Sequence, residues 1–392
     1  MWREVRVTRV LIAGDTCPIG SNEPFFCKGD AAGLLGDLAA EFEKADLVVA
    51  NLECPLADAE SPLPKVGPCL RAPVAAVNGL KAMGIDVAGL ANNHMMDHGA
   101  QGLYSTIEAL EAQNIAYVGV GKNLLEARRI LVRRVGSVRL GILAMAEHEF
   151  SIASSEAPGA NPMDVFDAVK NIRGHRSACD CFVVLIHGGN ENYPYPGPTL
   201  LKTCRFLAEE GASAVICQHS HCAGSMEIHH RVPIVYGQGN FLFQLASPLE
   251  NWYEGCLVRL TINDTGPCEI EMLPFKQHVD HPGLRRMNPE EESAWRRAFN
   301  DRSGRLADPQ AVEAEWEKYC QRQTLHYLHM LHGQKTLARR LAGKLGLIRL
   351  LDRPDKQLTR LSIIRCQSHR DALITILEHE AKAAKSQPFD EV

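Results

Sequence analysis

Residues that can bind metal ions follow five strand-like runs of this sequence. The runs end in Gly14-Asp15, Asn51-Leu52-Glu53, Asn92-Asn93-His94, His187-Gly188-Gly189 and Gln218-His219-Ser220-His221. Ligands of open α/β sheets bind beyond the carboxyl ends of the strands, so we expect these segments to meet at one edge. His219 and His221 are two residues apart, and in an extended segment such residues point the same way and can face one ion.

These residue types indicate a transition-metal centre. Taken singly, each signal is weak, because Gly-Asp and Asn-Asn pairs are common in turns. Five of them at successive strand ends favour one shared site. Imidazole nitrogens combined with carboxylate and amide oxygens suit Mn, Fe or Zn better than Ca. We expect one or two divalent ions held by six groups: three imidazoles, two carboxylates and one Asn carbonyl oxygen.

The elements that position these residues are predicted from the sequence pattern. Runs of β-branched residues alternate with amphipathic stretches long enough to form helices. Strands are expected at 5–13, 47–51, 87–90, 138–144, 181–186 and 214–218. Helical stretches fall between them, for instance at 33–43, 102–113 and 198–209. This pattern is typical of a layered α/β domain. After His221 the strand signals are closely spaced, so we expect an antiparallel section to close the sheet.

The composition is that of a globular protein. Of the 392 residues, 45% are hydrophobic and 23% are charged, and the formal net charge of −5 argues against a general nucleic-acid binder. No apolar run approaches the ~20 residues that cross a bilayer, and the first residues lack the apolar core of a signal peptide. We expect a cytoplasmic protein, at most peripheral to the inner face of the membrane. The thirteen cysteines are scattered and odd in number, which predicts reduced thiols.

The sequence predicts three segments: a catalytic domain at 1–275, a linker at 276–292 and a basic helical extension at 293–392. The linker carries His-Pro-Gly, Asn-Pro and three consecutive acids. The extension is basic from Lys335 to Arg370, where three Lys and seven Arg accompany two Asp. Three roles are open for it: packing on the catalytic domain, lying on an anionic membrane surface, or guiding an anionic polymer or a partner enzyme to the site.

Seven sequence blocks resemble one known family. They are LIAGDTCPIG, VVANLECPL, CLRAP, GIDVAGLANNHMMDHG, HGGNENYPYPGP, GASAVICQHSHCAGSMEI and PIVYGQGNFLF, and they span about residues 11–244. The chain resembles the capsule-synthesis protein A family, the poly-γ-glutamate capsule branch of the calcineurin-like metallophosphoesterase superfamily. The resemblance implies a four-layer αββα sandwich with a metal cluster at the edge of the sheets, and the helical extension lies outside it.

The resemblance also implies roles for the six ligands. Asp15 and His221 would hold one metal ion. Asn93, His187 and His219 would hold the other ion. Glu53 stands where the superfamily usually has a bridging Asp.

Four further positions bear on the expected chemistry. By the same resemblance His94 would contact the phosphoryl group and act as general acid, and Asp97 would orient its imidazole. Two positions depart from the pattern. Cys17 stands where the wider superfamily has a His, and Gly188 stands where many members of the family carry Trp.

Substrate contacts are predicted from residues in the matched blocks that can meet anionic oxygens. Each of them is equally suited to bracing a loop. The four candidates are Lys65, Arg71, Tyr193 and Asn240.

The expected function is a metal-dependent phosphomonoesterase or phosphodiesterase acting in bacterial capsule or surface-polymer biosynthesis. A metal-bound hydroxide would attack phosphorus in a phosphorylated small molecule or capsule polymer, and His94 would protonate the leaving oxygen. Poly-γ-glutamate itself has amide bonds and no phosphate. Two alternatives therefore stay open: a noncatalytic metal-binding component of a poly-γ-glutamate synthesis complex, and a γ-glutamyl amide hydrolase.

Overall fold

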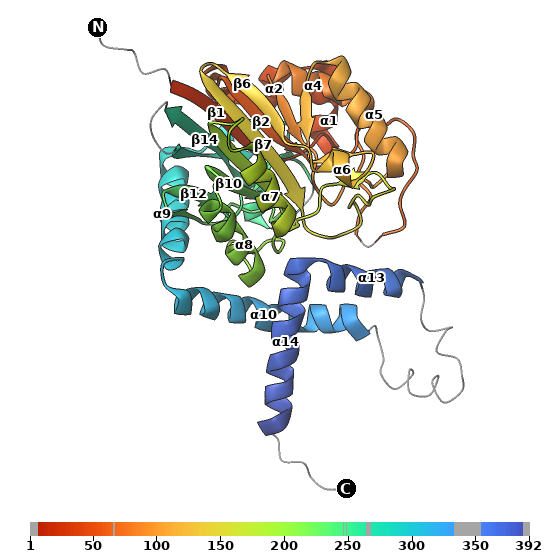
Figure 1. The fold of residues 1–392 in the computed structure, drawn as a ribbon, viewed down its shortest axis with the longest axis vertical. Coiled ribbons are helices and arrows are strands. Elements are labelled where there is room, and N and C mark those ends of the chain that lie inside the picture. Colours follow the sequence, from red (N-terminus) through yellow and green to blue (C-terminus); the bar gives the residue numbers. More distant parts are fainter. Residues whose placement is uncertain are drawn as a thin grey trace.

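Two β-sheets packed face to face form the centre of the molecule, and helices cover their outer faces (Figure 1). The structure is a computed structural model, and it describes residues 7–386 except 66, 246, 248, 264–267 and 333–353. The predicted four-layer αββα architecture with helices at the C-terminal end is confirmed.

The first sheet has eight strands, in the order β16-β15-β14-β1-β2-β3-β4, with β13 also paired to β1. Neighbours among β1 to β4 are parallel, β13 is parallel to β1, and β14 to β16 form the expected antiparallel section. The bounds are β1 Val7–Cys17, β2 Leu47–Leu52, β3 Val87–Gly89, β4 Ala116–Val118, β13 Asn240–Phe243, β14 Glu254–Asn263, β15 Glu269–Gln277 and β16 Leu284–Arg286.

The second sheet has six strands, in the order β11-β12-β10-β9-β7-β6. Its four inner strands are parallel and its two edge strands antiparallel. The bounds are β6 Leu131–Val135, β7 Val138–Ala146, β9 Cys181–His187, β10 Ala214–Gln218, β11 Met226–His229 and β12 Val232–Val235. A separate two-stranded ribbon pairs β5 Val120–Gly121 with β8 Gly159–Ala160.

The helices divide into two groups, one on each side of the sheets. Helices α1 to α6 precede the second sheet along the chain, and α7 to α14 follow or flank it. The bounds are α1 Glu23–Lys28, α2 Ala31–Leu35, α3 Ala39–Glu43, α4 Val77–Ala82, α5 Gly99–Ala112, α6 Leu124–Ala127, α7 Val165–His175, α8 Pro198–Glu209, α9 Pro289–Arg305, α10 Pro309–His332, α13 Pro354–Arg365 and α14 Gln367–Ser386.

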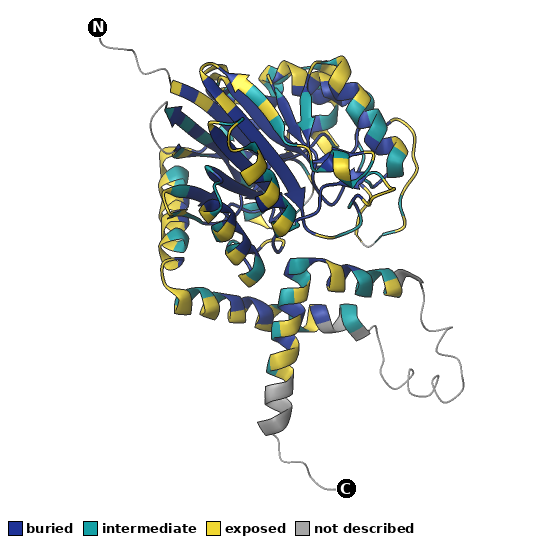
Figure 2. Ribbon diagram, in the orientation of Figure 1, coloured by how far each residue is buried: buried dark blue, intermediate teal, exposed yellow. Residues whose placement is uncertain are grey.

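The main core lies between the two sheets and continues under the first group of helices. Leu11 of β1 and Val183 of β9 belong to one cluster of buried side chains, which also takes in Leu110 of α5. A second cluster joins the other face of the second sheet to Leu207 of α8 and Trp316 of α10. The inner strands are buried, whereas the edge strands β6 and β11 and the outward faces of the helices are partly exposed (Figure 2). Each fully buried large aliphatic side chain contributes about 1.5–3 kcal/mol, so the sandwich holds its strand ends firmly.

The segment at 276–292, expected to be a linker, is instead part of the first sheet. β15 runs to Gln277, and β16 pairs antiparallel with it. Leu284 is 2% exposed, so this short hairpin buries an apolar side chain that a solvated linker would leave in water. Asn288 then begins α9 with a capping box that it forms with Glu291. The Pro and Gly residues mark turns within the fold rather than a boundary.

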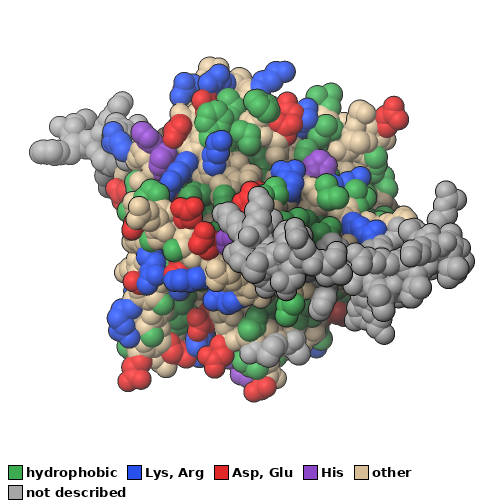
Figure 3. Space-filling view, turned by 90° about the horizontal axis from the view of Figure 1, so that it is seen from below, with side chains coloured by type: hydrophobic (Ala, Val, Ile, Leu, Met, Phe, Trp, Pro, Cys, Tyr) green, Lys and Arg blue, Asp and Glu red, His purple; other side chains and the backbone are tan. Residues whose placement is uncertain are grey.

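The helices at the C-terminal end pack below the sandwich. α10 crosses α14, and both lie at the edge of the second sheet (Figure 1). Seen from this side, acidic and basic side chains of the described residues are interspersed (Figure 3). The amphipathic basic stretch at 337–351 lies outside the described residues. In the part of the chain that the structure describes, no helix combines the length and apolarity needed to span a membrane.

Candidate metal centre

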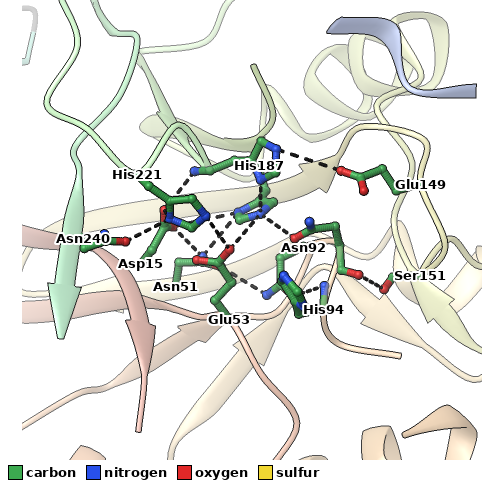
Figure 4. Close-up of polar contacts among 12 residues, drawn as sticks. Asp15, Asn51, Glu53, Asn92, His94, Glu149, Ser151, His187, His221 and Asn240 are labelled. Atoms are coloured by element: carbon green, nitrogen blue, oxygen red, sulfur yellow. Dashed lines mark hydrogen bonds and ion pairs between the residues drawn. The ribbon is translucent and has the colours of Figure 1, made fainter. Parts of the chain in front are cut away.

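Five strand ends from the two sheets meet at one edge and bring the six predicted ligands together (Figure 4). Three ligands come from the first sheet and three from the second. All six are at most 8% exposed. The predicted convergence is thus seen in the structure, with Asp15 in β1, Glu53 after β2, Asn93 after β3, His187 ending β9, and His219 and His221 after β10.

Asp15 lies inside its strand rather than just beyond it. β1 continues to Cys17, and its register with β2 shifts between Ala13 and Asp15. A bulge of this kind adds a residue to one strand and redirects its side chains. The irregularity therefore turns the Asp15 carboxylate toward the ligands of the second sheet.

One set of donor atoms surrounds Nε2 of His187. This nitrogen is 3.0 Å from Oδ1 of Asn93 and 3.0 Å from Nδ1 of His219. It is 3.5 Å from Oε1 of Glu53. Four potential ligand atoms from four different strand ends therefore converge on a single point.

A second set adjoins the first and shares Glu53 with it. Nε2 of His221 is 3.7 Å from Oε1 of Glu53, and Nδ1 of His221 is 3.5 Å from Oδ2 of Asp15. Two triads each hold their ligand atoms within 4.8 Å of one another: Asp15, Glu53 and His187, and Glu53, His219 and His221. The common carboxylate suits a bridging role. By these shortest distances His187 and His219 lie with Asn93, and His221 lies with Asp15.

The residues of the site fit a divalent cation because no group of the protein compensates the negative charge of one buried carboxylate. Glu53 is fully buried, and neither of its carboxylate oxygens has a hydrogen-bond partner. Burial, followed by the negative charge of Asp15, raises the pKa of Glu53 well above its ordinary value. An unpaired buried carboxylate is costly in free energy. A cation at this point would satisfy Glu53 and Asp15 together.

The histidines are in the form that binds metal. Burial lowers the pKa of His219 to about 3 and that of His187 well below its ordinary value. Both imidazoles are therefore neutral near pH 7, and a neutral imidazole offers a lone pair to an ion. The site combines neutral nitrogen donors with carboxylate and amide oxygens, the donor set expected for Mn, Fe or Zn.

Two asparagines that the sequence analysis did not single out orient the ligands. Nδ2 of Asn51 donates to Oδ1 of Asp15 at 2.8 Å and lies 3.3 Å from Nδ1 of His187. Asn92 donates in turn to Oδ1 of Asn51 at 3.3 Å. Such partners of metal ligands fix ring orientation and raise affinity. The sequence indicates them only in that they lie in the same strand-end segments as Glu53 and Asn93.

The loop after β10 holds its two histidines in left-handed backbone conformations. The φ angle is 96° at His219 and 52° at His221. For residues other than Gly this conformation costs on the order of 1–3 kcal/mol and persists where the surroundings enforce it. Here the backbone N–H of His219 donates to Oδ2 of Asp15 at 3.0 Å, which ties the loop to the opposite sheet.

His94 and Asp97 form the predicted pair beside the ligands. Nδ1 of His94 is 2.7 Å from Oδ2 of Asp97, and the backbone N–H of Leu70 donates to the same oxygen at 2.6 Å. Lys65 forms an ion pair with Asp97 and lies 3.1 Å from Nδ1 of His94. Burial lowers the pKa of His94, and the hydrogen bond to Asp97 acts against this shift.

The other three predicted substrate contacts serve the fold in this structure. Arg71 donates to the carbonyl oxygen of Ala57 at 2.7 Å and pairs with Glu60, so it braces a loop. Asn240 places its Oδ1 2.9 Å from Nδ1 of His221 and thereby positions that ring.

Tyr193 is 2% exposed and packs within an aromatic cluster. Its ring centroid is 4.3 Å from that of Tyr319 and 5.8 Å from that of Trp316. The cluster fixes α10 against the loop after β9. Tyr193 thus has a packing role here rather than an open face toward a substrate.

The two departures from the family pattern have structural explanations. Cys17 is fully buried, and burial together with its contact to the Cys54 thiol raises its pKa well above the ordinary value. A thiol of that kind stays protonated and is a poor ligand. At Gly188 a Cβ atom would lie 2.6 Å from Cγ of Glu147. A larger side chain therefore has no room there.

Glu149 is a further acidic group of the site. Its Oε1 lies 3.9 Å from Nε2 of His219. Burial, together with the charge of nearby Glu147, raises the pKa of Glu149 to about 7. In the sequence Glu149 follows the strand β7. No motif there distinguishes it from an acidic residue of an ordinary exposed loop.

Comparisons with known proteins identify the family of this chain. The family model for the bacterial capsule synthesis protein PGA_cap matches residues 9–245. Capsule biosynthesis protein CapA of Bacillus anthracis is 28% identical over 215 residues, which cover 53% of this chain and 51% of the relative. A Mycobacterium tuberculosis protein named a probable polyglutamine synthesis accessory protein is 29% identical over 306 residues, covering 71% of this chain and 76% of the relative.

Among solved structures, a 5'-nucleotidase from Candida albicans aligns with a TM-score of 0.40 and 12% identity, covering 69% of this chain and 52% of that one. The chain spans about half the length of the Bacillus anthracis and Bacillus subtilis relatives that it matches. The family model covers more than half of this chain and includes all six ligand positions. The chain belongs to the PGA_cap family of bacterial capsule synthesis proteins.

Proposed function

We propose that this chain is a metal-dependent hydrolase of phosphate esters in bacterial capsule or surface-polymer biosynthesis. The observation that carries the proposal is Glu53, a fully buried carboxylate without hydrogen-bond partners, surrounded by imidazole nitrogens. The candidate ligands are Asp15, Glu53, Asn93, His187, His219 and His221, and the candidate ions are Mn, Fe or Zn. A bound divalent ion supplies Lewis acidity, which polarises a phosphoryl oxygen and lowers the pKa of water.

His94 is the proposed general acid. Its Nδ1 faces Asp97 at 2.7 Å, which fixes the ring and stabilises the imidazolium that forms when Nε2 takes up a proton. That proton then passes from Nε2 to the oxygen of the departing alcohol. Lys65 shares Asp97 and limits how far the carboxylate raises the basicity of His94. Lys65 and Asp97 therefore tune and hold His94 without touching the reacting atoms.

The test is metal content and turnover measured on the same samples. The full chain, loaded with Mn²⁺ or Zn²⁺, is expected to hydrolyse p-nitrophenyl phosphate or its diester. The His219→Ala variant should lose most of its bound metal and its turnover together. His175→Ala serves as the matched control, because His175 lies on α7 and its ring forms a hydrogen bond only with the Asn171 carbonyl oxygen among the described residues.

Two alternative functions make different predictions in this assay. If the chain binds metal stoichiometrically and cleaves neither ester, it is not a phosphoesterase for such substrates. Release of glutamate from a γ-glutamyl anilide by the same metal-loaded sample would then identify a γ-glutamyl amide hydrolase. Silence in both assays with intact metal binding would favour the noncatalytic assembly component, a role in keeping with the name of the mycobacterial relative.

A further inference from the structure

The segment where α13 meets α14, residues 365–369, lies against two loops beside the metal centre, those after β7 and β9. The backbone N–H of His148, in the loop after β7, donates to Oε1 of Gln367 at 3.0 Å. Nδ2 of Asn190, in the loop after β9, donates to the carbonyl oxygen of Ser368 at 3.3 Å. A segment about 180 residues away in sequence thus forms part of the rim of the site.

A buried carboxylate anchors this turn. Glu147 accepts hydrogen bonds from Oγ of Ser368 at 2.6 Å, from the backbone N–H of Ser368 at 3.3 Å and from Sγ of Cys366 at 3.0 Å. It therefore sits at the N-terminal end of α14, where the helix dipole favours a negative charge. Gly188 leaves the space that Glu147 occupies. Both the turn, through its hydrogen bonds, and the loop after β9, through Gly188, therefore accommodate the Glu147 side chain.

His369 follows directly in this anchored turn, and its ring is held in one orientation. The hydroxyl of Tyr327 lies 2.8 Å from Nδ1 of His369. That hydroxyl accepts a hydrogen bond from Nδ2 of Asn190 at 3.5 Å, so its own proton is free to go to His369. Nδ1 is then the acceptor and the ring proton resides on Nε2. Within the described residues, Nδ1 alone of the two ring nitrogens has a hydrogen-bond partner.

Glu191 links His369 to the metal centre. It is exposed, and it follows β9 by four residues. The backbone N–H of Asn192 donates to the carbonyl oxygen of Ser220, between His219 and His221, at 2.8 Å, and Asn190 donates to Ser368, so Glu191 lies between the loop after β10 and the turn that carries His369. The rim therefore presents a hydrogen-bond donor, Nε2–H of His369, which lies outside the residues matched by the family model, and an acceptor, the Glu191 carboxylate, which lies within them.

We propose that His369 and Glu191 form an outer subsite that binds the hydroxyl groups of a sugar-like leaving group next to the metal-bound phosphoryl group. A donor beside an acceptor suits hydroxyls, because each hydroxyl can accept from the imidazole and donate to the carboxylate. This inference rests on the proposed phosphoesterase function and names its substrate class: phosphate esters of polyols. The C-terminal helices then contribute a substrate-contacting residue to the site.

The test compares two probes on the metal-loaded full chain. Affinities for inorganic phosphate and for glucose 6-phosphate are measured by calorimetry, so that the result does not depend on turnover. We expect glucose 6-phosphate to bind at least about 5-fold more tightly, which corresponds to one moderate hydrogen bond. His369→Ala and Glu191→Gln should each reduce this preference to within about 2-fold while leaving the affinity for phosphate unchanged.

A matched control lies on the same helix. His379 of α14 faces Glu317 of α10, so His379→Ala should keep both affinities of the unmodified chain. His369→Gln provides a second variant that keeps a hydrogen-bonding side chain beside Tyr327 if the Ala variant folds poorly. Circular dichroism and metal content verify that every variant is folded and loaded.

Three results would overturn the subsite. The unmodified chain could bind both probes equally, the preference could survive both substitutions, or His369→Ala could lose metal and phosphate affinity together, which would place His369 in the support of the metal ligands. Failure of the proposed function gives a different result. The metal-loaded chain would then prefer glucose 6-phosphate and lose this preference in the two variants, yet hydrolyse no phosphate ester. That outcome would support the subsite and refute the hydrolase function.

Discussion

Two buried glutamates in this molecule have opposite surroundings. Glu41 of α3 is 6% exposed, and Arg286 donates to it at 2.5 Å, with Arg259 and Lys44 also paired to it. Glu53 is fully buried beside the rings of His187 and His221, and its carboxylate oxygens have no hydrogen-bond partner among the described residues. Burial acts to raise the pKa of both carboxyls. At Glu41 the Arg and Lys partners outweigh it and lower the pKa to about 2, whereas at Glu53 the pKa rises.

The difference distinguishes a carboxylate that stabilises the fold from one that is suited to bind a cation. The chain supplies arginines where a carboxylate joins α3 to β14 and β16. Among the described residues no arginine or lysine pairs with Glu53, and an added cation would compensate its charge. Four experiments test this difference, and they are given in order of decreasing expected effect.

Replacing Glu53 by Gln should have the largest effect. Affinity for Mn²⁺ or Zn²⁺ should fall by about 100-fold or more, because a shared ligand contributes at least as much as the partners that orient ligands. Without metal, the same variant should gain about 1–3 kcal/mol in free energy of unfolding, because burial makes the ionised form of Glu53 costly and raises its pKa, whereas Gln needs no proton on folding. Calorimetric titration and urea unfolding measure the two quantities. An apo variant less stable than the unmodified chain would contradict the interpretation of Glu53.

Adding metal should stabilise the unmodified chain and leave the Glu53→Gln variant unaffected. At a free ion concentration about 100 times the dissociation constant, a ligand that binds only the folded state adds about 2.7 kcal/mol. The Glu41→Gln variant should gain as much as the unmodified chain. Thermal unfolding with and without the ion provides the measurement, and an equal gain in the Glu53→Gln variant would place the ion elsewhere.

Replacing Glu41 by Gln should destabilise the protein by about 2 kcal/mol at pH 7, the scale of hydrogen bonds to charged groups. The pKa of Glu41 is lowered from 4.5 to about 2 on folding, so its stabilisation is complete above about pH 4.5 and is lost as the pH falls toward 2. The variant should lose this part of the acid dependence. Glu271→Gln is the control: that exposed partner of Arg259 should change stability by less than about 1 kcal/mol.

Replacing Asp97 by Asn should have the smallest effect of the four. Metal content should be unchanged and kcat for an aryl phosphate should fall by about 10-fold, because His94 loses the carboxylate that stabilises its protonated form. The pH optimum should also move to lower pH. Loss of metal in this variant would mean that Asp97 supports the ligands instead of His94.

The sequence predicted the convergence of the six ligands because the signal is local. An apolar run followed by Asp, Asn or His places the polar residue at a strand end, and parallel strands bring their ends to the same edge. Asn51 and Asn92 were missed as positioning residues, because an amide beside a ligand looks the same in sequence as an amide in a turn. Their roles depend on which ligand they meet across the sheet.

Long-range pairing accounts for the other differences. The stretch 276–292, which contains β16, resembles a linker in sequence because the burial of Leu284 depends on helices far earlier in the chain, near Gly36. The aromatic ring of Tyr193 was assigned to substrate because its partners, Tyr319 and Trp316, lie over 120 residues away and outside the matched blocks. Amphipathic periodicity predicted the C-terminal helices, but it does not say which loops their ends contact.

Position 188 bears on how α14 is attached to the rest of the fold. Any residue with a β-carbon there has to displace the Glu147 side chain, and with it the three hydrogen bonds that secure the start of α14. Glycine at 188 and Glu at 147 therefore act together to hold the start of α14 against the loops beside the ligands.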